Sequence, residues 1–123
     1  MYSEKVLEHF QHPQHVGTIE DADGFGQAGG GPRCPDDLVH LWIRVADGRI
    51  AEIRHRTLGC PVAIATSSMT CVLAQGKTLA EALAITPEQV IEALGGVPER
   101  KEDSAVAPQA LRQAIADYQS RRR

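Results

Sequence analysis

The chain has 123 residues, which suits a single domain, residues 1–123, built around one hydrophobic core. Its formal net charge is −3, and it lacks the excess of basic residues that neutralises phosphates, so we expect no nucleic acid partner. No run of about 18 apolar residues occurs, and the start of the chain, MYSEKVLEHF, lacks the apolar core of a signal peptide. We therefore expect a cytoplasmic protein with no membrane partner.

The first predicted element is a short amphipathic helix over residues 3–12, with Ser3 as its N-cap and Pro13 beyond its end. Residues 17–35 are rich in glycine and poor in large apolar side chains. This composition indicates flexible backbone or a weak edge strand, and the stretch from Gly24 could supply a strand.

The segment 38–58 predicts an antiparallel hairpin, because apolar residues alternate along it and Asp47-Gly48 is a dipeptide typical of a hairpin turn. The alternating apolar residues before the turn are Val39, Leu41, Ile43 and Val45, and those after it are Ile50, Ala51 and Ile53. Together with the stretch from Gly24, this segment predicts a three-stranded antiparallel sheet with one face toward the core.

A helix is predicted directly after Cys60, because Pro61 suits the first helical position and the apolar residues that follow recur at helical spacing up to Gly76. Two short helices are predicted next, because one capping-box pattern begins at Thr78 and a second begins at Thr86.

Residues 97–104 are polar and predict a loop, and an amphipathic helix from Pro108 closes the chain. Strands and helices are therefore segregated along the sequence. This order predicts an α+β fold in which a short three-stranded sheet packs with four to five helices.

The three cysteines, an odd number, favour metal or sulfur chemistry over structural disulfides. Cys60 precedes a helix, whose N-terminal end stabilises a thiolate. Cys34 shares a loop with Asp36, and because the outer ends of an antiparallel pair meet, Cys34 and Cys60 are expected to lie close together. Cys71 lies roughly 16 Å further along the helix and is interpreted as a packing residue.

Several motifs carry a resemblance to a known family. Tyr2-Ser3-Glu4-Lys5-Val6 resembles the family's N-terminal run, and Cys34-Pro35-Asp36 resembles its first ligand motif, Cys-Gly-Asp. Thr57-Leu58-Gly59-Cys60 resembles its second cysteine motif. Over essentially its whole length the chain resembles the IscU/NifU-type scaffolds of iron–sulfur cluster assembly, in the manner of the NifU N-terminal domain.

The resemblance implies that Cys34, Asp36 and Cys60 bind an iron–sulfur cluster or iron. The family's histidine and third cysteine fall on Asp103 and Ser104, so the chain is expected to be a diverged member without the third ligand cysteine. With Cys34, Asp36, Cys60 and Asp103 as ligands, a single zinc ion is a further expected metal.

The resemblance also implies a binding protein rather than an enzyme, with a cysteine desulfurase and acceptors of iron–sulfur clusters as partners. The family's chaperone-recognition motif, Leu-Pro-Pro-Val-Lys, is matched only in part by residues 97–101, so chaperone docking is the least supported partnership.

Two other hypotheses stay open. The chain could be a degenerate pseudo-scaffold that regulates the desulfurase or binds another component of the assembly machinery. It could also be a thiol enzyme that uses Cys60 as its nucleophile, although neither His40 nor His55 is clearly placed as the base.

Overall fold

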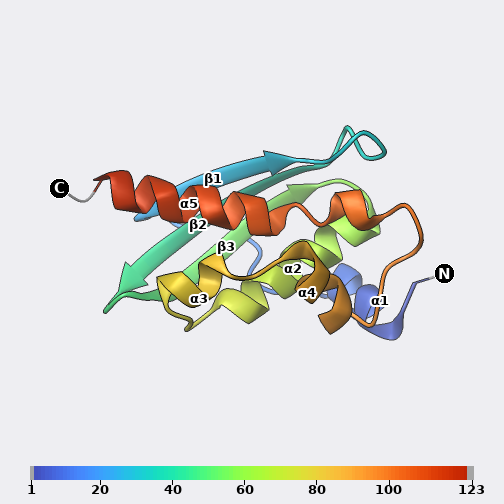
Figure 1. Ribbon diagram of the computed structural model, residues 1–123, viewed down its shortest axis with the longest axis horizontal. Coiled ribbons are helices and arrows are strands. Elements are labelled where there is room, and N and C mark those ends of the chain that lie inside the picture. Colours follow the sequence, from blue (N-terminus) through green and yellow to red (C-terminus); the bar gives the residue numbers. More distant parts are fainter. Residues whose placement is uncertain (1, 122–123) are drawn as a thin grey trace.

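A computed structural model describes residues 2–121 (Figure 1). Its sheet has three antiparallel strands in the order β1–β2–β3, which are β1 (Gly24–Gly29), β2 (Leu38–Ala46) and β3 (Arg49–Leu58). The helices in this part of the chain are α1 (Glu4–Gln11), α2 (Pro61–Ala74), α3 (Leu79–Leu83), α4 (Pro87–Ala93), the short 3₁₀ helix η1 (Glu102–Ser104) and α5 (Ala107–Arg121). The predicted α+β fold is confirmed.

The hairpin of β2 and β3 turns at the predicted dipeptide. Asp47 and Gly48 both have positive φ, 55° and 72°, as a two-residue turn that follows the right-handed twist of the strands requires. The register pairs Leu38 with Leu58, so the start of β2 and the end of β3 lie at the same edge of the sheet. The hairpin therefore brings the loops that carry the first two cysteines together.

The predicted helix signals are confirmed as caps. The Ser3 hydroxyl accepts a hydrogen bond from the Val6 amide at 3.1 Å, and Thr78 and Thr86 each complete a capping box. Cys60 is the N-cap of α2, and Pro61 follows it at the first helical position. The loop predicted over residues 97–104 contains one short turn of helix, η1, at its end.

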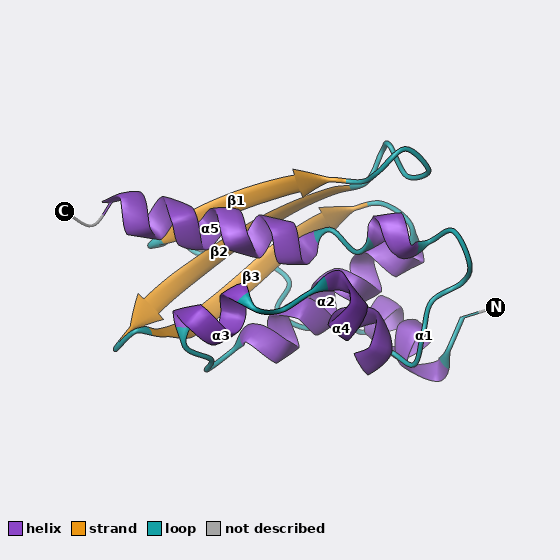
Figure 2. Cartoon of the chain, viewed as in Figure 1, coloured by secondary structure: helices purple, strands orange, loops and turns teal. Residues whose placement is uncertain are grey.

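The helices α2 and α5 cover one face of the sheet, α5 on β1 and β2 and α2 on β3 (Figure 2). The side chains that point from the hairpin into this layer are fully buried and include Val39, Leu41, Ile43, Ile50 and Ile53. In the described part of the chain, no helix is long and apolar enough to cross a membrane.

A buried histidine attaches the segment after α1 to the edge of the sheet. His55 Nε2 lies 3.0 Å from the Gln14 carbonyl oxygen, and its Nδ1 lies 2.9 Å from Thr57 Oγ1. The backbone amide of His55 also donates to the His15 carbonyl at 2.8 Å. Burial is the main cause that lowers the pKa of His55 from its ordinary value of 6.5 to about 4.

The lowered pKa of His55 predicts that the folded protein becomes less stable as the pH falls. Between pH 6.5 and about 4 the unfolded chain binds a proton at His55 that the folded chain does not. The contribution of neutral His55 to the free energy of unfolding is therefore fully present above pH 6.5 and is lost as the pH falls toward 4. The loss is on the order of 3 kcal/mol in the free energy of unfolding. Urea unfolding at several pH values should show a much flatter dependence for His55→Gln. The exposed control His12→Gln should keep the slope of the unmodified protein, and an unchanged slope in His55→Gln would contradict the assignment.

Candidate functional site

The loop between β1 and β2 folds tightly around the first cysteine. The amide of Cys34 donates to the Gly31 carbonyl at 2.9 Å, and the amide of Gly30 donates to the Asp37 carbonyl at 3.0 Å. Cys34 is only 7% exposed, so its thiol faces the interior of the protein at this end of the sheet.

The second cysteine reaches the same place from the end of β3. Gly59 precedes it with φ of +153°, a conformation that favours glycine. A side chain at Gly59 would collide with the Asp37 carboxyl group. The missing side chain thus lets Asp37 approach Cys60, whose amide donates to Asp37 Oδ1 at 3.4 Å.

A buried serine joins these groups. Ser104 closes η1 and is fully buried, and its carbonyl accepts a hydrogen bond from Thr66 Oγ1 on α2 at 3.2 Å. The Ser104 Oγ donates to Asp37 Oδ2 at 2.7 Å. The same oxygen lies 3.0 Å from Cys34 Sγ and 3.3 Å from Cys60 Sγ. We call Cys34, Asp37, Cys60 and Ser104 the thiol cluster.

One hydroxyl therefore contacts two thiols and a carboxylate. A hydroxyl has a single proton, and an ionised carboxylate is a stronger acceptor than a sulfur atom, so the short bond to Asp37 is the dominant one. The four groups come from the β1–β2 loop, the N-terminus of α2 and η1, which are distant in sequence. Their convergence brings two soft sulfur donors and two hard oxygen-bearing groups together in one place.

The carboxylate in this cluster belongs to Asp37 and not to Asp36. Asp36 is exposed, because the turn that links the Asp37 amide to the Cys34 carbonyl at 3.2 Å directs it outward. The alternation of β2 contains a signal for this difference. Counting back by twos from buried Val39 reaches Asp37 on the core side, whereas the motif match alone points to Asp36.

Asp103 lies beside the cluster without joining it. Its Oδ2 accepts a hydrogen bond from the Arg33 amide at 3.5 Å, and its carboxyl group packs against Gly31. Within residues 2–121, no three side chains of His, Cys, Asp or Glu are arranged to hold a metal ion. Binding of zinc by Cys34, Asp36, Cys60 and Asp103 stays a prediction.

The remaining thiol is separate from this cluster. Cys71 is fully buried within α2, and burial raises the pKa of its thiol well above the ordinary value. It therefore behaves as a packing residue, in agreement with its position in the sequence.

The sequence matches the NifU-like N-terminal domain family over residues 1–123. The chain belongs to this family. Members of the NifU-like family that resemble it include IscU 1 of Archaeoglobus fulgidus, named an iron–sulfur cluster assembly scaffold protein. That relative is 55% identical over 119 residues, which cover 96% of this chain and 76% of the relative.

The IscU scaffold protein of Escherichia coli K12 is 41% identical over 125 residues, which cover 98% of this chain and 96% of the relative. Among solved structures, the N-terminal domain of a NifU-like protein from Brucella abortus superposes with a TM-score of 0.76. That match covers 95% of this chain and 93% of the other at 17% identity, so it supports the fold alone. The resemblance to the NifU-like family is confirmed.

The central position of Ser104 predicts a cost for its removal. In Ser104→Ala the Asp37 carboxylate loses its shortest hydrogen bond in a buried setting, and the free energy of unfolding should fall by about 1–3 kcal/mol. Urea unfolding measures the change. Ser120→Ala, at an exposed position on α5, is the matched control and should change stability by less than about 0.5 kcal/mol. Equal stabilities of the two variants would mean that the hydroxyl does not hold the cluster together.

Proposed function

We propose that this chain is a scaffold on which an iron–sulfur cluster is assembled, with Cys34, Cys60 and Asp37 as ligands of that cargo. The observation that carries the proposal is the convergence of two thiols and a carboxylate on one buried hydroxyl. Membership of the NifU-like family, whose relatives are named iron–sulfur cluster assembly scaffold proteins, supports the same role.

The donor set fits such a cargo in its chemistry. Iron–sulfur units are held mainly by cysteine thiolates, and two are available here. The fourth group of the cluster, Ser104, offers oxygen in place of sulfur. Because thiolates are the softer ligands, two sulfur and two oxygen donors should hold a cluster more weakly than an all-cysteine site. A weakly held cluster suits a protein that passes it on.

Loading requires the thiol cluster to open. The Ser104 hydroxyl stands between the donors, so its contacts with Cys34 and Cys60 must be exchanged for contacts with the cargo. Cys60 is partly exposed, whereas Cys34 is buried, which makes Cys60 the first thiol that an incoming sulfur or iron atom meets.

The partners implied are a cysteine desulfurase, which supplies sulfur, and acceptor proteins, which take up the finished cluster. The chain acts in this role as one domain, and a reducing cytoplasm suits its cysteines, all of which are free in the structure. The weak match at residues 97–101 leaves chaperone docking without structural support.

The alternatives are less well supported. A pseudo-scaffold would have no reason to keep Cys34 and Cys60 in contact with the same hydroxyl. A thiol enzyme needs a base, and among the described residues no histidine is hydrogen-bonded to Cys60. The ring nitrogens of His55 are hydrogen-bonded to Gln14 and Thr57. His40 lies on the face of the sheet that points away from α2 and α5.

Anaerobic reconstitution with iron, sulfide and a desulfurase should produce visible charge-transfer absorption. Cys34→Ala and Cys60→Ala should abolish it, and Ser104→Cys should increase cluster yield and lifetime because a thiolate replaces a hydroxyl. Asp37→Asn should alter the spectrum or the lifetime, whereas its neighbour Asp36→Asn should not. Cys71→Ala is the control for a thiol outside the cluster.

Metal analysis of the same samples shows whether the protein has bound iron or zinc. Full absorption in both Cys34→Ala and Cys60→Ala would contradict the proposed ligands. Co-purification of a desulfurase with no cluster under any condition would favour the pseudo-scaffold.

A further inference from the structure

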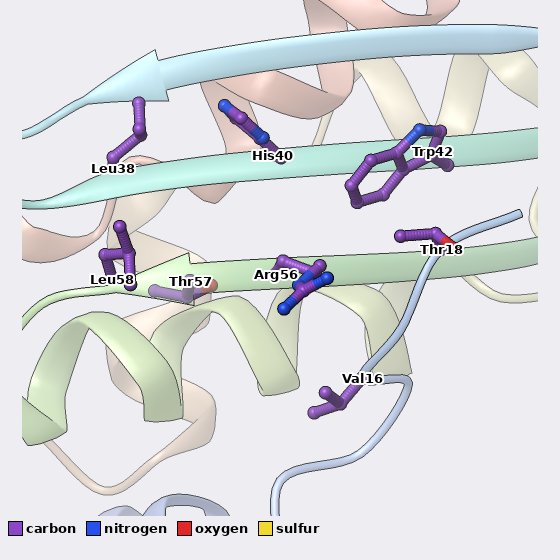
Figure 3. Close-up of a pocket in the computed structure, with 8 residues that line it drawn as sticks. All are labelled: Val16, Thr18, Leu38, His40, Trp42, Arg56, Thr57 and Leu58. Carbon is purple, nitrogen blue, oxygen red and sulfur yellow. The ribbon is translucent and has the colours of Figure 1, made fainter.

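The face of the sheet opposite α2 and α5 carries a hollow of about 560 Å³ (Figure 3). We call it the sheet-face groove. It is lined by Val16, Thr18, Leu38, His40, Trp42, Arg56, Thr57 and Leu58. None of these residues belongs to the thiol cluster.

The groove is apolar and open. Leu58 is 69% exposed and Val16 is 54% exposed, the two most exposed large apolar side chains in the described part of the chain. Contiguous exposed apolar surface of this kind marks an interaction site. Because the rim is open to solvent, the groove suits an extended polypeptide better than an enclosed small molecule.

The floor of the groove is held in place by aromatic packing. The rings of His40 and Trp42 lie 6.1 Å apart, and both pack against Phe25 on β1, at 5.4 Å and 5.3 Å. A floor fixed in advance loses little side-chain freedom when a ligand binds.

The groove also has a distinct charge. Arg56 is exposed and, within residues 2–121, its side chain forms no hydrogen bond or ion pair, whereas the neighbouring Arg44 and Arg54 both pair with Glu52. No Asp or Glu lines the groove, although the whole chain has a net charge of −3. An unpaired guanidinium beside apolar side chains complements a carboxylate beside apolar side chains.

We propose that the sheet-face groove docks an extended segment of a partner protein that combines bulky apolar side chains with Asp or Glu. Leu58 lies two residues before Cys60, and Leu38 lies four residues after Cys34, so the groove ends next to the thiol cluster. A partner anchored there is held beside the site of cluster assembly. This last step rests on the proposed function, whereas the docking itself does not.

Trp42 gives a direct readout, because it is the only tryptophan of the chain. The probe is a capped Leu-Leu-Glu-Glu peptide, titrated at millimolar concentration into metal-free, ¹⁵N-labelled protein. We expect shifts of the Trp42 indole signal and of the Arg56 and Leu58 amides in NMR spectra. The matched peptides Leu-Leu-Gln-Gln and Ser-Ser-Glu-Glu, which lack the charge or the apolar side chains, should bind at least about tenfold more weakly, a difference of 1.4 kcal/mol.

Arg56→Glu should weaken binding of the Leu-Leu-Glu-Glu peptide at least about tenfold. Arg112→Glu, an exposed charge reversal on α5, should leave it unchanged. The double variant Cys34→Ala, Cys60→Ala should bind the peptide normally and form no cluster, while Arg56→Glu should form a cluster normally. One variant therefore tests docking without affecting cluster assembly, and the other tests cluster assembly without affecting docking.

Three results would overturn the proposal. The first is equal binding of the glutamate and glutamine peptides. The second is a set of shifts confined to residues outside the groove. The third is a shift of the Trp42 signal with protein concentration alone, which would assign the groove to a second copy of this chain.

Discussion

The Ser104 hydroxyl is the point on which the candidate site depends. It lies against Cys34, Cys60 and Asp37 at 2.7–3.3 Å, and it is fully buried. A buried polar group needs partners, so the loops that carry these residues are held together as long as the hydroxyl is satisfied. Under the proposed function, the same contact keeps the donors from their cargo. The contacts that stabilise the resting site therefore oppose binding of the proposed cluster. A loading step would have to break the contacts of the Ser104 hydroxyl.

The rest of the fold places these groups. The register of β2 and β3 sets Leu38 opposite Leu58, which brings the two cysteine loops to one edge of the sheet. Gly59 leaves room for the Asp37 carboxylate, and Thr66 on α2 holds the carbonyl of Ser104. The thiol cluster lies just beyond the start of β2 and the end of β3, whereas the sheet-face groove is lined in part by Leu38 and Leu58 at those same strand ends.

Local signals in the sequence predicted the fold well. The Asp47-Gly48 turn, the capping boxes and the helix start after Cys60 depend on neighbours within a few residues, and the structure confirms them. The juxtaposition of Cys34 with Cys60 followed from the hairpin. The role of Ser104 did not, because its partners lie 44 to 70 residues away and no local pattern encodes them. The motif Cys34-Pro35-Asp36 points to Asp36, whereas the structure places the neighbouring Asp37 against Ser104.

Mössbauer spectroscopy of the ⁵⁷Fe-reconstituted protein tests the central claim most directly, because the isomer shift of each iron reports whether its ligands are sulfur or oxygen. If Cys34 and Cys60 supply sulfur while Asp37 or Ser104 supplies oxygen, the spectrum should show inequivalent iron sites with partial oxygen ligation. Ser104→Cys should then shift the oxygen-ligated site toward an all-sulfur value. A spectrum in which every iron has only sulfur ligands, and which Ser104→Cys leaves unchanged, would contradict the account.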